Sequence, residues 1–321
     1  MSRSHRLPAV LADRAAAGSR PGARIDGHRV ALAIEGGGMR GTVSAGMALA
    51  LHELGLLDAF DAVYGASAGA ISAAWLISSR PEGLRGWADP RFASALIRSS
   101  NVLRGRPVVD VETLIEEVYL RQFPLDYASV LAAAIELHPL ATDLDTGQPV
   151  DLRGELTDER VLRLALRASA ALPVLAGGPV TLGGRRFYDA GISESIPFRQ
   201  ALRDGATHVL VLRSRPPART RPVHVAPSAA SRLVAALALR RHTVELRTAF
   251  LSRPARLAHD ESLLTVYDTD EAHSPADPAV LSIRPDPAAP QVGRLETDSS
   301  ILREALQAGY RAAESRLAGG C

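Results

Sequence analysis

The chain has 321 residues, a formal net charge of +2, 46% hydrophobic and 22% charged residues, as expected of a globular protein with one large or two smaller cores. No run of about 18 uncharged apolar residues occurs and the N-terminal apolar stretch is too short for a signal peptide, so we expect a cytoplasmic protein without a transmembrane helix. The single cysteine, Cys321, excludes a disulfide framework, and the absence of lysine excludes P-loop, Schiff-base and Ser–Lys chemistry.

The first half of the chain alternates between strand and helix patterns. Residues 1–27 are Arg-rich and predict a flexible tail. The elements predicted after it are a buried strand over 29–34, a helix over 42–55, a short strand over 61–64 and a helix over 67–79. Strands and helices that alternate through tight loops predict an α/β fold with a parallel sheet.

The second half continues this pattern around one core. We expect helices over 80–128, 158–172 and 231–252, strands over 133–144, 185–191, 208–214, 263–269 and 279–285, and an amphipathic helix over 299–317. No internal repeat or linker interrupts these elements. We therefore predict one domain over residues 28–318.

Positive charge is concentrated in the basic segment 213–256. Between Gly205 and His259 the sequence has ten arginines and one acid, Glu245. Such a zone favours an anionic partner, which for this chain means phospholipid, phosphate or nucleic acid. Aromatic residues make up only 4% of the chain, so platforms for base stacking are scarce and nucleic acid is disfavoured. Docking on an anionic membrane and an ordinary solvated face both remain open.

Three motifs carry candidate chemistry, and the first is a serine between two glycines. Gly65-Ala-Ser67-Ala-Gly69 follows a predicted strand and precedes a predicted helix. This is the setting of a nucleophile elbow, where small neighbours permit a sharp turn. A serine that merely caps a helix would occupy the same position.

The second motif is a glycine loop, Glu35-Gly-Gly-Gly-Met-Arg-Gly41, again between a strand and a helix. Its backbone N–H groups suit an anion, either the pyrophosphate of a dinucleotide or the oxyanion of an acyl-transfer intermediate. A dinucleotide site normally has an acidic residue at the end of the second strand, whereas here that strand leads into Ser67. The sequence therefore favours an oxyanion hole.

The third motif is Tyr188-Asp189-Ala190-Gly191, at the end of a predicted strand. A nucleophilic serine needs a proton acceptor, and partial burial would raise the pKa of Asp189 toward that task. Taken alone, the motif is better read as a turn.

In this order the three motifs resemble the patatin-like phospholipase family, whose pattern is Gly-Gly-Gly-x-(Arg/Lys)-Gly, then Gly-x-Ser-x-Gly, then Asp-Gly-(Gly/Ala). The resemblance runs from about Val30 to Ala206 and includes the strand and turn ATDLDTG. It implies a three-layer α/β/α sandwich with a mainly parallel central sheet. It also implies a serine hydrolase that cleaves carboxylic esters of lipids, of the phospholipase A or esterase type, and needs no metal or cofactor.

The resemblance also implies roles for individual residues. Ser67 would be the nucleophile and Asp189 its base, in a dyad without histidine. The oxyanion loop would comprise Gly36, Gly37, Gly38, Met39, Arg40 and Gly41, with Gly65, Gly69, Ala190 and Gly191 as supporting motif positions. Arg40 would fix this loop or meet a lipid phosphate, unless it is simply a surface arginine. Ala190 departs from the usual glycine by one methyl group, which the loop tolerates unless that position needs a positive φ.

Three alternatives remain. A Ser-His-Asp hydrolase would draw its histidine from the candidates after Asp189, namely His208, His224, His242, His259 and His273. A non-enzymatic protein would use the basic segment to bind an anionic surface. An inactive family member is disfavoured because both Ser67 and Asp189 are present.

Overall fold

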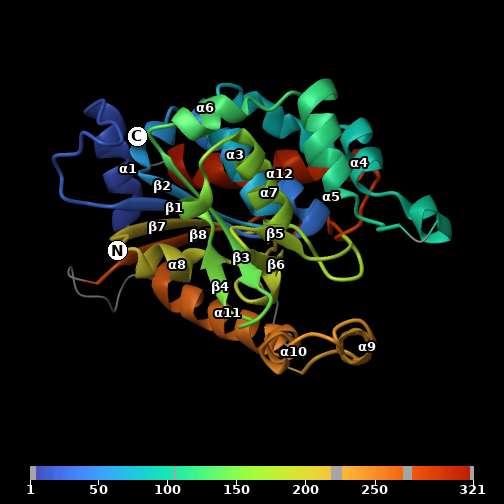
Figure 1. Cartoon of the computed structure of the whole chain (residues 1–321). Helices are drawn as coiled ribbons and strands as arrows, with labels where there is room; N and C mark the ends of the chain where they lie inside the picture. Colours follow the sequence, from blue (N-terminus) through green and yellow to red (C-terminus); the bar gives the residue numbers. More distant parts are fainter. Residues whose placement is uncertain (1–4, 105, 218–225, 270–276, 319–321) are drawn as a thin grey trace.

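The fold is organised around a central sheet (Figure 1). The structure is a computed structural model that describes residues 5–104, 106–217, 226–269 and 277–318. Within these ranges eight strands form one sheet, in the order β5-β6-β3-β2-β1-β7-β8 with β4 paired to β3. The strands are β1 Val30–Ile34, β2 Ala62–Ala66, β3 Glu136–Asp143, β4 Pro149–Asp151, β5 Val180–Leu182, β6 Arg185–Asp189, β7 His208–Leu212 and β8 Ala279–Ile283.

Five of these strands, β3-β2-β1-β7-β8, run parallel, whereas β4, β5 and β6 pair in antiparallel fashion. Every residue of β1, β2 and β7 is buried, which is the burial expected of parallel strands covered on both faces.

Helices cover the two faces of this sheet. The described α-helices are α1 Arg6–Ala16, α2 Gly41–Glu53, α3 Ala68–Ile77, α4 Pro90–Leu96, α5 Val111–Thr113, α6 Tyr127–Ala132, α7 Glu159–Ser169, α8 Phe198–Arg203, α9 Ala229–Leu237, α10 Val244–Leu251, α11 Arg253–Thr269 and α12 Ser299–Leu317. Shorter 3-10 turns are η1 Gly38–Arg40, η2 Leu57–Ala59, η3 Pro81–Ala88, η4 Ser99–Arg104, η6 Arg153–Glu155 and η7 Ala190–Ile192, and η5 Leu114–Gln122 is a π-helix.

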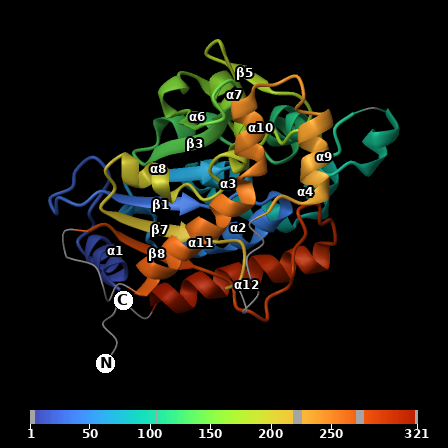
Figure 2. The ribbon, with the colours of Figure 1, turned by 90° about the horizontal axis from the view of Figure 1, so that it is seen from below.

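Alternate residues of β1 separate the two cores. Val30, Leu32 and Ile34 pack with α2, α3 and α12, whereas Ala31 and Ala33 face α8 and α11. Figures 1 and 2 show α8 and α11 on the face of the sheet opposite α3 and α12. The predicted three-layer sandwich with a mainly parallel sheet is therefore confirmed. None of the helices in the described ranges is long and apolar enough to span a bilayer.

Helix α2 is buried along almost its whole length because α12 crosses it at very close range. A Cβ atom built on Gly46 would lie 2.0 Å from the carbonyl oxygen of Leu306, and one on Gly309 would lie 1.9 Å from that of Val43. Each helix thus approaches the backbone of the other at a glycine, and no larger residue fits at either position.

The structure differs from the predicted flexible tail over residues 1–27, of which residues 5–27 are described. Residues 6–16 form α1, whose Leu7 and Leu11 are buried. Arg14 is also buried and contacts Asp26 and Asp61 through ion pairs of 2.6 and 2.9 Å. Leu7 and Leu11 are four residues apart and therefore lie on one face of α1. Together with the ion pairs of Arg14, they order a segment that is polar in overall composition. That residues 28–318 form one domain stays a prediction.

Two predicted elements also differ in the basic segment and just after it. The single helix expected over 231–252 is divided into α9 and α10, because Thr243 caps a new helix by accepting a hydrogen bond from Leu246 N. The strand expected over 263–269 is the last part of α11. There Leu264 is buried and Leu257 and Tyr267 pack beside it, a helical spacing that prevails over local strand propensity.

Candidate active site

Ser67 lies at a sharp turn between β2 and α3. Its backbone has φ 55° and ψ −122°, an unusual conformation for a residue other than glycine. The flanking glycines make this turn possible. A Cβ atom on Gly65 would lie 2.3 Å from the Cα of Ala70, and one on Gly69 would lie 2.2 Å from the carbonyl oxygen of Ile34. A backbone held in this conformation is typical of a functional position.

The register of β3 explains how Asp189 comes to lie near this turn. Leu140 pairs with Ala66 of β2, and the next residue, Ala141, pairs with Asp189 of β6. Because β4 pairs with both Leu140 and Ala141, β2 and β6 must both lie on the opposite side of β3. The parallel strand β2 and the antiparallel strand β6 therefore approach each other end to end, and their last residues occupy consecutive positions along β3.

The Asp189 side chain is buried, with 5% of its surface exposed. Its Oδ1 atom accepts a hydrogen bond of 2.7 Å from Gly191 N, and its carbonyl oxygen accepts one of 2.8 Å from Thr142 Oγ1. Burial raises the pKa of the Asp189 carboxyl above its ordinary value, opposed by a hydrogen bond from the Ser67 side chain and by the positive charge of Arg253. The carboxyl group is thus more basic than an exposed aspartate and in contact with Ser67.

The glycine loop lies against the same turn, since a Cβ atom on Gly36 would be 3.2 Å from that of Ser67. Two of its N–H groups are already engaged: Gly36 N donates to the carbonyl oxygen of Ser195 and Met39 N to that of Arg294, each at 3.0 Å. The N–H groups of Gly37 and Gly38 have no hydrogen-bond acceptor among the described residues. Of the predicted loop residues, these two are free to bind an anion.

The remaining loop residues serve other purposes. Met39 is fully buried in the core. Gly41 allows α2 to approach α3, because a Cβ atom there would lie 2.9 Å from that of Ala68. Arg40 lines a neighbouring cavity together with Glu35 and Arg215, rather than the cavity that contains Ser67.

Glu35 anchors the start of the glycine loop. Its Oε2 atom accepts hydrogen bonds from Arg213 Nε at 3.1 Å and from Ser214 N at 2.8 Å, and both Glu35 and Arg213 are buried. Burial by itself would raise the pKa of Glu35, but the charge of Arg213 and the Ser214 amide hold it below the ordinary value. Glu35 is therefore an ionised structural partner of Arg213.

A narrow cavity of about 60 Å³ joins Ser67, Asp189 and the loop residues Gly36, Gly37 and Gly38. One part of its wall is apolar and comprises Ile71, Trp87, Leu96, Val109, Leu172 and Leu175. The other part includes Arg253 and Arg294, which the sequence analysis missed. Arg253 begins α11 and Arg294 lies in the loop before α12, so neither belongs to a motif near the serine.

No histidine lines this cavity among the described residues. His208 is buried in β7 and hydrogen-bonds Thr207, and His259 is exposed. His242 reaches only the Tyr188 hydroxyl, at 3.5 Å. The other two candidates, His224 and His273, lie outside the described residues.

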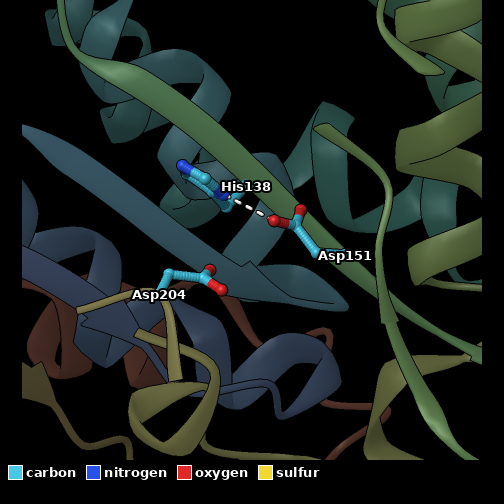
Figure 3. A group of neighbouring side chains, drawn as sticks. All are labelled: His138, Asp151 and Asp204. Atoms are coloured by element: carbon cyan, nitrogen blue, oxygen red, sulfur yellow. Dashed lines mark hydrogen bonds and ion pairs between the residues drawn. The ribbon is translucent and has the colours of Figure 1, made fainter. Parts of the chain in front are cut away.

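A second polar group comprises His138, Asp151 and Asp204 (Figure 3), none of which lines the Ser67 cavity. His138 Nδ1 lies 2.6 Å from Asp151 Oδ2, and the imidazole ring stacks on Tyr64 with 4.1 Å between ring centroids. The contact between His138 and Asp151 joins β3 to β4.

The arginines of the basic segment do not form one surface. Arg213 pairs with Glu35 and Glu261 in the interior, Arg253 lines the cavity, and Arg256 donates to the carbonyl oxygen of Ile192. Exposed arginines remain at Arg215 and at Arg232, Arg240 and Arg241 on and after α9, whereas residues 218–225 lie outside the described ranges.

Fold and site together place the protein in the class of α/β proteins with a patatin fold, in which a serine turn and a glycine loop meet at one edge of a largely parallel sheet. The model of the patatin-like phospholipase family matches residues 32–202, more than half of the chain, and the chain belongs to this family.

The similarity to curated relatives covers only part of each of those proteins. The uncharacterized protein YjjU of Escherichia coli K12 is 29% identical over 218 residues, which cover 66% of this chain and 58% of that protein. An uncharacterized NTE family protein of Mycobacterium tuberculosis H37Rv is 31% identical over 202 residues, 60% of this chain and 48% of that protein. The chain thus spans about half the length of these relatives.

Two solved structures are also similar. VipD from Legionella pneumophila aligns with a TM-score of 0.48 and 14% identity over 91% of this chain and 67% of its own. Human GIVD cytosolic phospholipase A2, in complex with methyl gamma-linolenyl fluorophosphonate, aligns with a TM-score of 0.44 and 16% identity. This alignment covers 97% of this chain and 60% of the phospholipase chain.

Proposed function

We propose that the protein hydrolyses acyl esters of lipids, with Ser67 as nucleophile and Asp189 as its base. Membership of the patatin-like phospholipase family supports lipid hydrolysis in general. The observation that carries the finer assignment is the register of β3, which brings Asp189 to the turn that holds Ser67. No other acid lines their cavity among the described residues.

In the first step Ser67 Oγ attacks the ester carbonyl and its proton passes to the Asp189 carboxylate. The raised pKa of Asp189 makes it a better acceptor than an exposed aspartate would be. The resulting oxyanion is held by the free N–H groups of Gly37 and Gly38, and one such donor is typically worth about 3 kcal/mol of transition-state stabilisation. The alcohol leaves with the proton, and water then releases the acid from the acyl-enzyme.

The apolar wall of the cavity supports a fatty acyl chain as the group that is transferred. Trp87, Leu96 and Leu175 would bury the chain beside Ser67. Burying one methylene group contributes about 0.8 kcal/mol, so a pocket of this kind favours longer acyl chains over acetyl esters.

Contact with a lipid surface would bring such a substrate to the cavity, and α9 suits that task. Leu233 and Leu237, one turn apart, are 59% and 61% exposed, and the exposed Arg232, Arg240 and Arg241 lie on and just after the same helix. Both views place α9 at the edge of the molecule, beside α10. Apolar residues flanked by arginines fit an anionic membrane, whereas a merely solvated helix would not need exposed leucines.

Labelling with a fluorophosphonate, together with hydrolysis of p-nitrophenyl esters, tests the nucleophile. We expect the wild-type protein and the control variant Ser94→Ala, altered at an exposed serine of α4, to be labelled equally. Ser67→Ala should not be labelled, and Asp189→Asn should be labelled far more slowly. Persistent labelling of Ser67→Ala, or no labelling of the wild type, would contradict the proposal.

A further inference from the structure

Four arginines near the active site lack partners. Among the described residues, the side chains of Arg40, Arg215, Arg253 and Arg294 have neither a hydrogen bond nor an ion pair, and the Nε atoms of Arg40 and Arg253 are buried without an acceptor. Arg215 is exposed, but Arg40, Arg253 and Arg294 are partly buried, and a charge removed from water without a partner is costly to the folded state. Such a cluster beside a cavity is therefore typical of a site whose counter-ion is a ligand.

The same four residues repel one another. Burial and the charges of Arg215, Arg294 and Arg253 lower the pKa of Arg40 to about 9. Burial and the charge of Arg294 lower that of Arg253 to about 10, although Asp189 acts in the opposite direction. Arg253 and Arg294 line the same cavity, where a bound anion would relieve this repulsion.

Two of the four reach the reacting groups. A Cβ atom built on Gly191 would lie 2.7 Å from Asp189 Oδ1 and 3.2 Å from Arg253 Nη2, so these two charged groups flank the same glycine. The carbonyl oxygen of Arg294 accepts the hydrogen bond from Met39 N, which ties its loop to the glycine loop. Both side chains line the cavity of Ser67, whereas Arg40 and Arg215 line the neighbouring one.

The acidic residues that line the two cavities already have other roles or partners. Asp189 is the only acidic residue among the described residues that line the Ser67 cavity. In the neighbouring cavity Glu35 pairs with Arg213, and Glu261 pairs with both Arg213 and Arg284. Hence no carboxylate of the described residues that line these two cavities remains to pair with a quaternary or primary ammonium group. The site thus suits an anion and disfavours a headgroup that carries a cation.

We propose that Arg253 and Arg294 bind the phosphate of an acidic phospholipid, one whose headgroup carries no cation, while Ser67 attacks the neighbouring acyl ester. This inference rests on the proposed function and adds its substrate preference. The paired guanidinium groups match the oxygens of a phosphate, with which arginine forms two parallel hydrogen bonds.

Kinetics with short-chain lipids below their critical micelle concentration test the preference without any contribution from membrane docking. Dihexanoyl phosphatidic acid, dihexanoyl phosphatidylcholine and dihexanoylglycerol share the acyl ester and differ in charge. For the wild type we expect kcat/KM to be highest for phosphatidic acid. In Arg253→Gln/Arg294→Gln the ratio of kcat/KM for phosphatidic acid to that for dihexanoylglycerol should fall about ten- to hundredfold, because any effect of the lost charges on Asp189 is common to both substrates.

Two variants serve as controls. Arg303→Gln removes an exposed arginine of α12 and should leave all three rates unchanged. Arg253→Lys/Arg294→Lys keeps the charges but loses the planar fork, so its loss for phosphatidic acid should be smaller than that of the glutamine variant. The double glutamine variant should melt no lower than the wild type, because it removes two partly buried charges that have no partner among the described residues.

The outcomes separate this inference from the proposed function. If no ester is hydrolysed and Ser67 is not labelled, the proposed function fails. If dihexanoylglycerol is hydrolysed but the ratio of phosphatidic acid to phosphatidylcholine rates is the same in wild type and double variant, only the inference fails. If inorganic phosphate competes with dihexanoylglycerol but phosphatidic acid is not preferred, the arginines bind a free anion and the lipid assignment is overturned.

Discussion

Ala66 and Asp189 occupy consecutive pairing positions along β3, the first opposite Leu140 and the second opposite Ala141. Ser67 follows Ala66 directly, so one strand fixes the separation of the two proposed catalytic groups. Thr142, the next residue of β3, donates a hydrogen bond to the carbonyl oxygen of Asp189.

Replacing Thr142 should therefore affect activity through the position of Asp189. Thr142→Val removes the hydroxyl that contacts both the Asp189 carbonyl oxygen and Ser193 Oγ, at a cost of about 1–3 kcal/mol to the folded state. We expect kcat for a p-nitrophenyl ester to fall while KM changes little. Thr142→Ser should restore most of the rate, and equal losses in both variants would contradict a role for the hydroxyl.

Asp189→Asn should separate activity from stability. Loss of the base is expected to lower kcat by about a thousandfold or more, measured with a soluble ester. The pKa of Asp189 is raised in the folded protein, so its contribution to stability is largest at low pH and is lost as pH rises through that pKa. At pH 7 the variant should thus melt no lower than the wild type. A clearly lower melting temperature would show that the carboxylate stabilises the fold.

The pH dependence of the wild-type enzyme follows from the same shift. Asp189 accepts a proton only when ionised, so kcat/KM should fall as pH decreases through its raised pKa. The acid limb of the profile should accordingly lie above the ordinary aspartate value of about 4. An acid limb at or below that value would argue against Asp189 as the base.

Histidine should be dispensable for the chemistry. Of the five candidates after Asp189, the three in the described ranges, His208, His242 and His259, do not line the cavity. We expect single alanine variants of all five to retain ester hydrolysis, with His208→Ala the least stable because its side chain is buried in β7. Loss of labelling at Ser67 in any folded variant would instead indicate a Ser-His-Asp mechanism.

The contact between α2 and α12 should tolerate no side chain at its glycines. Gly46→Ala or Gly309→Ala would force a methyl group against a backbone carbonyl and lower the free energy of unfolding by about 1–3 kcal/mol. Urea denaturation measures this loss. Gly154→Ala is a matched control, since a Cβ atom there meets nothing within 4 Å.

Helix α9 should govern binding to anionic vesicles. Leu233→Asp/Leu237→Asp, and separately Arg232→Gln/Arg240→Gln/Arg241→Gln, should weaken co-sedimentation with phosphatidylglycerol vesicles, and wild-type binding should decrease with salt. Val266→Asp, which alters a residue of α11 that is 51% exposed, should bind like the wild type. If the wild type does not bind even at low salt, α9 is an ordinary solvated helix.

Sequence reasoning predicted the features that depend on local pattern. The apolar run of β1, the turn around Ser67 and the closing helix α12 all follow from residues adjacent in the chain. Arg253 and Arg294 could not be predicted in this way, because they meet Asp189 only after α11 and the loop before α12 pack beside it. The free N–H groups of Gly37 and Gly38 likewise emerge only when Ser195 and Arg294 engage their neighbours.

The division of the cavity between strands and helices has a consequence for engineering. The groups proposed to react stand at the ends of β2 and β6 and are held in register by β3, whereas Trp87, Leu96 and Val109 come from the segment between α3 and α5. A deletion of one residue within β3 would turn its side chains to the opposite face and separate Ser67 from Asp189. The segment over 80–111 can instead be exchanged between relatives to alter the accepted chain length while the reacting groups stay in place.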